Sequence, residues 1–231
     1  MNQTKTVSVA HAVRTRVLRG GARSWTTSDF PDYSASAVTA ALQRMARQGD
    51  LLAVHHGIYW RGTRRPWGMS RPDSLQLTRA IFHSKGVGWA GLSASNALGL
   101  NTQVPAVETI AVPVAKPRSV RGIHFVDRAR RTPRAAARLT PLEVAFLEVL
   151  GDWTDVLEGS PKDAVNHMSS MLLDGEVDCA RLVKASAGED GPVRDRLRHV
   201  LHVAGKDEAA QRIKPSASKA TTRRALAGIA A

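Results

Sequence analysis

The stretch Ser34–Gly62, SASAVTAALQRMARQGDLLAVHHGIYWRG, decides the expected fold of the N-terminal part of the chain. Val38, Leu42 and Met45 follow one another at helical spacing and predict a helix with one apolar face. Serines at its start can accept a hydrogen bond from an unpaired backbone amide, and Gly49 is expected to end it. The opposite face of this helix is polar and basic.

A short two-stranded ribbon is expected directly after this helix. Leu51–Val54 and Ile58–Trp60 are both rich in residues that favour strands, and His55-His56-Gly57 between them fits a tight turn. A plainer interpretation is an ordinary amphipathic helix packed beside a hairpin, with a polar face that is only solvated. The residues upstream favour a more specific arrangement.

The upstream sequence predicts two further helices. An apolar helical pattern runs from Val9 to Leu18 and is closed by Gly20-Gly21, and Trp25–Phe30 suits a short second helix that Pro31 stops. Three helices and a ribbon in roughly sixty residues make a small complete domain of the winged helix-turn-helix type. We therefore predict a winged helix-turn-helix DNA-binding domain over residues 1–66.

Such a domain assigns DNA contacts by role. Gln43 can bond adenine, Arg44 or Arg47 can bond guanine, and Ala40 can contact a thymine methyl group. The ribbon and nearby cations are expected on the DNA backbone or in the minor groove, and the cations of the first helix and its turn on phosphates. For each residue, the alternative is a solvated surface side chain. The predicted DNA-binding residues are Ser36, Thr39, Ala40, Gln43, Arg44, Arg47, His55, His56, Arg61, Arg64, Arg65, Arg14, Arg16 and Arg23.

The composition of the 231-residue chain agrees with a nucleic-acid partner. Its formal net charge is +13, and clustered cations gain affinity for polyanions by releasing counterions from phosphates. The single cysteine, Cys179, excludes an intramolecular disulfide and a cysteine-rich zinc site. No apolar run reaches the roughly 18 residues of a membrane span, and the N-terminus lacks the apolar segment of a signal peptide. A cytoplasmic protein is expected.

The charge is distributed in blocks. Residues 114–140 hold eight Lys or Arg against one Asp, whereas residues 141–190 hold eleven acidic and three basic residues. Like charges at this density repel one another without a polyanion nearby, so we expect a second basic surface. The alternative is an Arg-rich loop whose charges are paired with the acidic segment 141–190. The predicted surface comprises Lys116, Arg118, Arg121, Arg128, Arg130, Arg131, Arg134 and Arg138.

An α+β second domain is expected over residues 72–205, in which helices flank a small sheet. Residues 61–72 are rich in Arg, Pro and Gly and are expected to form a linker. Thr140-Pro141-Leu142-Glu143 is a strong helix start, with a capping threonine, proline at the first helical position and glutamate three residues after the cap. The other expected helices are Ser74–Phe82, Leu92–Leu98, 161–173 and 193–203, the expected strands are Val107–Val114 and Gly122–Val126, and residues 206–231 are expected to form a loose basic tail or a frayed helix.

Three motifs together resemble a known family: the GIYW ribbon at Gly57–Trp60, the segment WAGLSASNALGL at Trp89–Leu100, and ETIAVP at Glu108–Pro113. In residues 8–150 the chain resembles AbiEi-type antitoxins, the regulators of bacterial type IV toxin–antitoxin operons whose toxin is a nucleotidyltransferase. The resemblance implies a repressor that binds inverted repeats in its own promoter and contacts additional DNA through its C-terminal domain. It also implies neutralisation of the toxin, directly or indirectly.

The residues indicate no active site. Gly91-Leu92-Ser93-Ala94-Ser95 begins like a nucleophile elbow but lacks the closing glycine, and the histidines show no metal-ligand spacing. We therefore expect no enzymatic activity, no metal and no cofactor. Two other hypotheses remain open: a module that mainly holds a partner protein through residues 141–203, and a nucleic-acid enzyme that would use Glu108 and Lys116.

Overall fold

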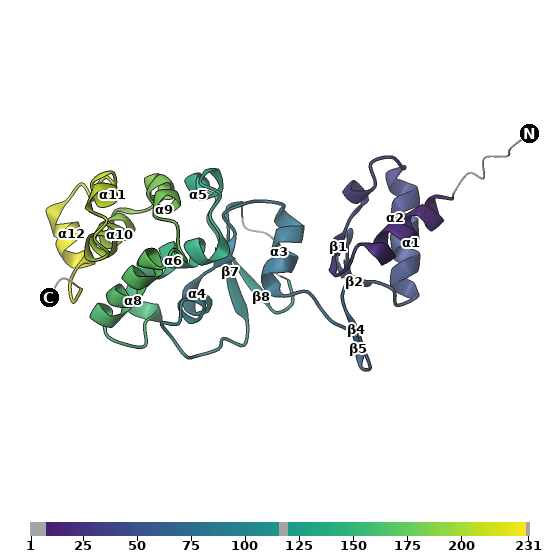
Figure 1. Ribbon diagram of the computed structural model, residues 1–231, viewed down its shortest axis with the longest axis horizontal. Coiled ribbons are helices and arrows are strands. Elements are labelled where there is room, and N and C mark those ends of the chain that lie inside the picture. Colours follow the sequence, from purple (N-terminus) through teal and green to yellow (C-terminus); the bar gives the residue numbers. More distant parts are fainter. Residues whose placement is uncertain (1–7, 116–119, 230–231) are drawn as a thin grey trace, which may run out of the picture. The chain divides into compact units, whose positions relative to one another are not determined.

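The chain has an α+β fold and divides into two compact units after His83. The computed structural model describes residues 8–115 and 120–229 (Figure 1). The first unit comprises α1 (Val9–Arg19), β1 (Arg23–Trp25), the 3-10 helix η1 (Thr27–Asp29), α2 (Ala35–Arg47), β2 (Leu52–His55), β3 (Ile58–Arg61), β4 (Arg64–Arg65), β5 (Gly68–Met69) and α3 (Ser74–Phe82).

The first unit is built around the apolar face of α2. Val38, Ala41, Leu42 and Met45 are all buried, which confirms the predicted helical face. They pack with side chains from α1, with Trp25 and Phe30, and with the start of the ribbon. The expected second helix is reduced to one turn of 3-10 helix, because Trp25 belongs to strand β1 and Phe30 already leaves the helical conformation.

The predicted ribbon is present and belongs to a three-stranded antiparallel sheet in the order β1-β3-β2. Residues 61–72, expected to be a linker, instead form a second hairpin from β4 and β5. The indole of Trp60 donates a hydrogen bond to the Ser70 carbonyl at 2.8 Å, which ties this hairpin to the sheet. The first unit consequently continues past residue 66 and includes α3, which packs on β1.

The second unit places helices around a small mixed sheet (Figure 1). Strand β7 lies between an antiparallel β6 and a parallel β8, which confirms the expected strand pair. The elements are β6 (Gly88–Trp89), α4 (Gly91–Ala97), β7 (Glu108–Val112), β8 (Ile123–Asp127), α5 (Thr132–Ala136), α6 (Pro141–Gly151), α7 (Trp153–Val156), α8 (Pro161–Leu173), α9 (Cys179–Ala185), the 3-10 helix η2 (Ser186–Gly188), α10 (Gly191–Val203), α11 (Asp207–Gln211) and α12 (Lys219–Ala225).

Helix α6 is the centre of this unit. It begins with the predicted capping box, in which the Thr140 hydroxyl accepts from the amide of Glu143 and the Glu143 carboxylate accepts from the amide of Thr140. Every residue from Glu143 to Leu150 is buried, and the helix packs against α4, α10 and β6. Apart from Glu143 and Glu148, these buried residues are apolar on every side of the helix, as expected for an interior position.

Residues from 206 onward form α11 and α12 rather than a loose tail. The buried carboxylate of Asp195 on α10 accepts hydrogen bonds from the Ser216 amide at 3.0 Å and from the Thr222 hydroxyl at 2.9 Å. Ile213 and Ile229 are buried in the core of the second unit. The alternation of small and basic residues in this segment conceals the two apolar anchors, which explains why a tail was expected.

Candidate nucleic-acid interface

Helix α2 presents the candidate interface on the side opposite its buried face. Ala40, Gln43, Arg44 and Arg47 lie at helical spacing along one stripe and are all exposed. Ser36 is exposed at the start of the helix, and Thr39 is half-buried at the edge of the stripe. The structure therefore brings together all six residues that were predicted on this helix.

The cations of this stripe are not engaged by acidic side chains. Neither Arg44 nor Arg47 forms an ion pair with any residue of the described part of the chain. Ser34 occupies the N-cap position of α2, yet its side chain makes no capping hydrogen bond. Ser34 therefore satisfies none of the first backbone amides, at the end of the helix that carries the positive part of its dipole.

The turn of the β2–β3 ribbon carries two adjacent histidines. His55 and His56 are exposed, and Gly57 adopts a positive φ of 69°, a conformation that favours glycine. By contrast, Tyr59 and Trp60 are buried, so they serve the core and not the surface. The turn is therefore the part of the ribbon that is available to a ligand.

Asp50 joins two of the predicted phosphate-binding arginines. Its carboxylate accepts from Arg14 of α1 at 2.5 Å and from Arg64 of β4 at 3.1 Å. Arg14 also donates to the side chain of Gln48 at 3.3 Å. Both arginine side chains remain substantially exposed, 46% for Arg14 and 71% for Arg64. They fix the end of α2 against α1 and against the β4–β5 hairpin while remaining open to solvent.

Three other predicted DNA-binding arginines differ in their contacts with acidic and aromatic side chains. Arg23 pairs with Asp29 and lies 4.1 Å from the centre of the Trp25 ring, which gives it a role in the fold. Arg16 lies 5.3 Å from the centre of the Phe30 ring and is otherwise exposed. Arg65 is exposed on β4 and, among the described residues, has no acidic partner.

Trp67 was missed by the sequence analysis. It lies between Pro66 and Gly68 at the tip of the β4–β5 hairpin and is 85% exposed. The segment was expected to be a linker because of its Arg, Pro and Gly content. The signal that was available is the bulky aromatic residue next to the arginines, a combination common in surfaces that bind nucleic acids.

The predicted second basic surface is wrong for three of its members. Arg128, Arg131 and Arg134 point into the second unit and bind carboxylates of the acidic segment 141–190. Lys116 and Arg118 lie outside the described residues. Arg121, Arg130 and Arg138 are exposed, so only these three of the described members are available to a ligand.

The buried network centres on Arg134, whose side chain is 0% exposed. Its Nε donates to Glu189 at 2.6 Å, and it also binds Glu148. Glu148 accepts from Arg128 at 2.8 Å, and Arg131 reaches Glu189 at 2.6 Å. The acidic segment therefore neutralises the arginines that precede it, as the alternative interpretation predicted.

Electrostatics inside this network keep Glu148 and Arg134 charged. Burial alone would raise the pKa of Glu148, but the hydrogen bond from Arg128 and the charge of Arg134 together lower it below its ordinary value. Burial would likewise lower the pKa of Arg134, yet the hydrogen bond to Glu189 and the charge of Glu148 raise it. Arg134 and Glu148 therefore form a charged pair in the interior of the second unit.

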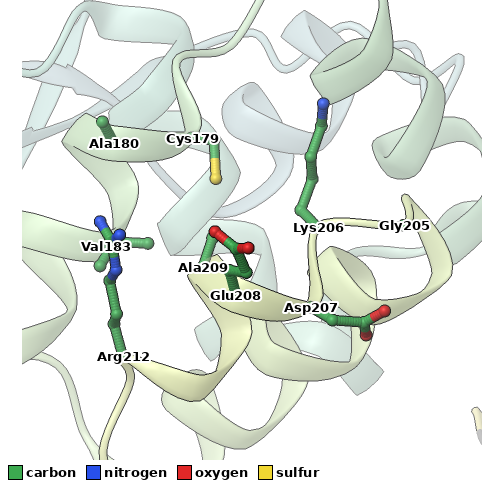
Figure 2. Close-up of a pocket in the computed structure, with 9 residues that line it drawn as sticks. All are labelled: Cys179, Ala180, Val183, Gly205, Lys206, Asp207, Glu208, Ala209 and Arg212. Carbon is green, nitrogen blue, oxygen red and sulfur yellow. The ribbon is translucent and has the colours of Figure 1, made fainter.

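A cavity of about 580 Å³ lies between α9 and α11 in the second unit (Figure 2). Cys179 borders it on one side, and Lys206, Glu208 and Arg212 border it on the other. Burial raises the pKa of the Cys179 thiol, so the thiolate that nucleophilic chemistry requires is disfavoured. The acidic and basic groups around the cavity are mixed, and they favour no particular charged ligand.

Within residues 8–115 and 120–229, no group of three or more His, Cys, Asp or Glu side chains could hold a metal ion. Ser93, from the segment that resembles a nucleophile elbow, is buried in α4 and its hydroxyl accepts from the amide of Thr109 at 3.0 Å. In the same part of the chain, no helix combines the length and apolar character needed to cross a membrane.

Comparisons with known proteins identify a distantly similar structure. No family model matches the chain, and no curated protein matches its sequence. Among solved structures, the chain is similar to the crystal structure of the RV2827C protein from Mycobacterium tuberculosis, with a TM-score of 0.43 and 18% sequence identity. The match covers 95% of this chain and 80% of that one. A likeness this distant carries no argument about fold or function.

Proposed function

We propose that the first unit is a winged helix that binds duplex DNA, with α2 as its recognition helix. The observation that carries the proposal is the exposed stripe Ala40–Gln43–Arg44–Arg47, which has two arginines without acidic partners among the described residues. The buried side of the same helix is fixed in the core, so the stripe is held in one orientation. Such a helix is suited to the major groove.

The dimensions and chemistry of the stripe suit base readout. From Ser36, exposed at the start of the helix, to Arg47, the polar face of α2 extends about 16 Å at a rise of 1.5 Å per residue, which corresponds to roughly five base pairs. Gln43 offers a bidentate pair to adenine, and Arg44 or Arg47 offers one to guanine. The ribbon turn at His55-His56 and the open side of Arg14 and Arg64 would then lie on phosphates or in the minor groove.

We further propose that the protein is a cytoplasmic, AbiEi-type antitoxin that represses its own toxin–antitoxin operon. This step depends on the resemblance of residues 8–150 to that family and on the net charge of +13, which favours a polyanionic partner. The partners are an inverted-repeat operator in duplex DNA and a nucleotidyltransferase toxin, which the protein counteracts directly or indirectly. No catalytic or cofactor-dependent step is part of this function.

The structure leaves less surface for the rival hypothesis, in which residues 141–203 mainly hold a partner protein. The part of that segment from Glu143 to Leu150 is buried inside the unit and cannot contact another protein. Helix α10 is largely covered by α11 and α12, whereas one side of α8 is exposed, so toxin binding through α8 stays a proposal.

Nuclease protection of the DNA upstream of the protein's own gene tests the proposed function. The full-length protein should protect an inverted repeat there, and Arg47→Ala should weaken the protection. Arg223→Ala is the matched control, because Arg223 is an exposed arginine of α12 that belongs neither to the proposed reading helix nor to the predicted second basic surface. Uniform protection of any duplex, with no effect of Gln43 or Arg47 substitutions, would contradict base readout.

A further inference from the structure

Trp67 stands apart from the other tryptophans of the chain. It is 85% exposed, whereas Trp25, Trp60 and Trp153 are each buried and Trp89 is half-buried. A single exposed apolar side chain is ordinary on a protein surface. The hairpin that carries Trp67, and the charges around it, give this one a more specific meaning.

Hydrogen bonds fix the β4–β5 hairpin, so it is not a flexible linker. The amide of Thr63 donates to the Ser70 hydroxyl at 2.9 Å, and the Ser70 amide donates to the Thr63 carbonyl at 2.9 Å. The buried Trp60 indole donates to the Ser70 carbonyl at 2.8 Å. A side chain at Gly62 would meet that carbonyl oxygen at 2.1 Å, so the close approach requires glycine. Trp67 therefore projects into solvent from a hairpin whose two ends are hydrogen-bonded to each other and, through Ser70, to the buried Trp60.

The sequence on both sides of Trp67 is basic. The sequence between Asp50 and Asp73 contains Arg61, Arg64, Arg65 and Arg71 and no acidic residue. Arg64 also fastens the hairpin beside the end of α2, through the Asp50 carboxylate at 3.1 Å and the Gly49 carbonyl at 3.4 Å. The hairpin that carries the exposed indole is thus fastened beside the C-terminal end of the proposed reading helix.

We propose that Trp67 is a DNA-contacting wedge, a second projection besides the β2–β3 ribbon. Its indole packs against a base step in the groove next to the one occupied by α2, while Arg65 binds a neighbouring phosphate. Aromatic rings gain energy on any base, and apolar wedges in the minor groove partly unstack the step that they enter. This inference rests on the proposed binding of duplex DNA and adds a residue, and a mode of contact, to that site.

Acrylamide quenching of tryptophan fluorescence tests the contact directly. Because Trp67 is the most exposed of the five tryptophans, it should dominate the quenching of the free protein. A mixed-sequence duplex of about three helical turns, added at low salt, should protect this emission from acrylamide. Trp67→Phe should remove both the strongly quenched component and its protection by DNA, while circular dichroism shows that the fold is retained.

Affinity for the same duplex provides a second readout. Trp67→Ala should weaken binding by about 5- to 150-fold, the range expected for loss of one stacked aromatic contact. Trp67→Phe should keep most of the affinity, because phenylalanine preserves an aromatic face. Val104→Ala is the matched control: Val104 is 82% exposed but lies in the second unit, and its removal should leave binding unchanged.

The outcomes separate this inference from the proposed function. If the wild-type protein binds the duplex, but Trp67→Ala binds equally well and DNA leaves the quenching unchanged, the wedge is wrong and DNA binding by α2 stands. If the wild-type protein binds no duplex, both proposals are overturned. A Trp67→Ala variant that loses a protein partner while keeping full DNA affinity would also overturn the wedge, and would assign the residue to a protein interface.

Discussion

The guanidinium of Arg134 and the carboxylate of Glu189 are both fully buried, and Nε of the arginine lies 2.6 Å from the glutamate oxygen. This pair joins α5 to the turn before α10, and Glu148 of α6 completes it from a third element. A stretch of sequence that reads as a basic surface is therefore in part the interior of the second unit. The charge of the segment does not reveal this, because the acidic partners are 14 and 55 residues away.

Removing Arg134 should severely destabilise the second unit. Arg134→Met removes the fully buried guanidinium that Glu148 and Glu189 share, and breaking a buried ion pair in this way costs about 3–5 kcal/mol. Urea unfolding followed by circular dichroism measures the loss. Arg121→Met is the control: this exposed arginine should change the free energy of unfolding by less than about 0.5 kcal/mol. Equal effects of the two substitutions would contradict the buried network.

The pH dependence of stability should carry the signature of Glu148. Its pKa in the folded protein lies below the ordinary value of 4.5, so its ionised form stabilises the fold above that pH. This stabilisation is lost as the pH falls through the lower, folded-state pKa. Glu148→Gln should therefore be less stable than wild type at neutral pH, and the difference in urea midpoint should shrink below pH 4.5.

Asp152 provides the contrast for this measurement. Burial raises its pKa, so its ionisation opposes folding and it gains stability as the pH falls. Asp152→Asn should therefore remove the stability that wild type gains from protonation of Asp152 as the pH falls. It should not cause the loss of stability at neutral pH that is expected of Glu148→Gln. A pH profile of Glu148→Gln that runs parallel to wild type would show that Glu148 is not held ionised by the arginines.

Arg47 and Arg65 should separate base readout from phosphate binding. Arg47→Ala, on the proposed reading helix, should cost about 1–3 kcal/mol on the preferred site and relax one base preference. Arg65→Ala, on the hairpin, should weaken all duplexes similarly and reduce the slope of log affinity against log salt by about 1. Fluorescence anisotropy with two duplex sequences at several salt concentrations measures both effects. If the two variants changed sequence preference and salt dependence in the same way, the assignment of base readout to Arg47 and phosphate binding to Arg65 would be wrong.

Asp50→Asn should release two cations toward DNA. The carboxylate holds Arg14 and Arg64, and its loss frees both guanidiniums and removes a negative charge near the phosphates. Affinity for mixed-sequence duplex should rise a few-fold and its salt dependence should steepen, with a stability cost below about 1 kcal/mol because both arginines are exposed. Asp32→Asn removes an exposed acid elsewhere in the first unit and is the control. Unchanged binding by Asp50→Asn would place this cluster away from the DNA.

The sequence predicted the elements with strong periodicity and capping, and the structure confirms them. The buried face of α2, the β2–β3 ribbon and the capping box at Thr140 follow from local patterns alone. The segments whose structure was predicted wrongly depend on contacts with residues elsewhere in the chain. Residues 61–72 form a hairpin because Trp60 binds Ser70, and the segment from 206 packs because Asp195 on α10 accepts from Ser216 and Thr222.

The candidate interface divides in the same way. Exposure of Gln43, Arg44 and Arg47 follows directly from the buried face of the same helix, so their arrangement could be predicted. The states of Arg23, Arg134 and Trp67 could not, because each depends on which side chains the fold brings near. Composition treats every arginine alike, whereas the structure separates those that are paired from those that are free to bind.

Selection of bound sequences from a pool of random duplexes measures the central claim most directly. If α2 reads bases, the wild-type protein should enrich one motif, and Gln43→Ala or Arg47→Ala should change the preferred base at one position of it while Arg223→Ala leaves the motif intact. Enrichment of no motif by the wild-type protein, or the same motif from all four proteins, would contradict the account.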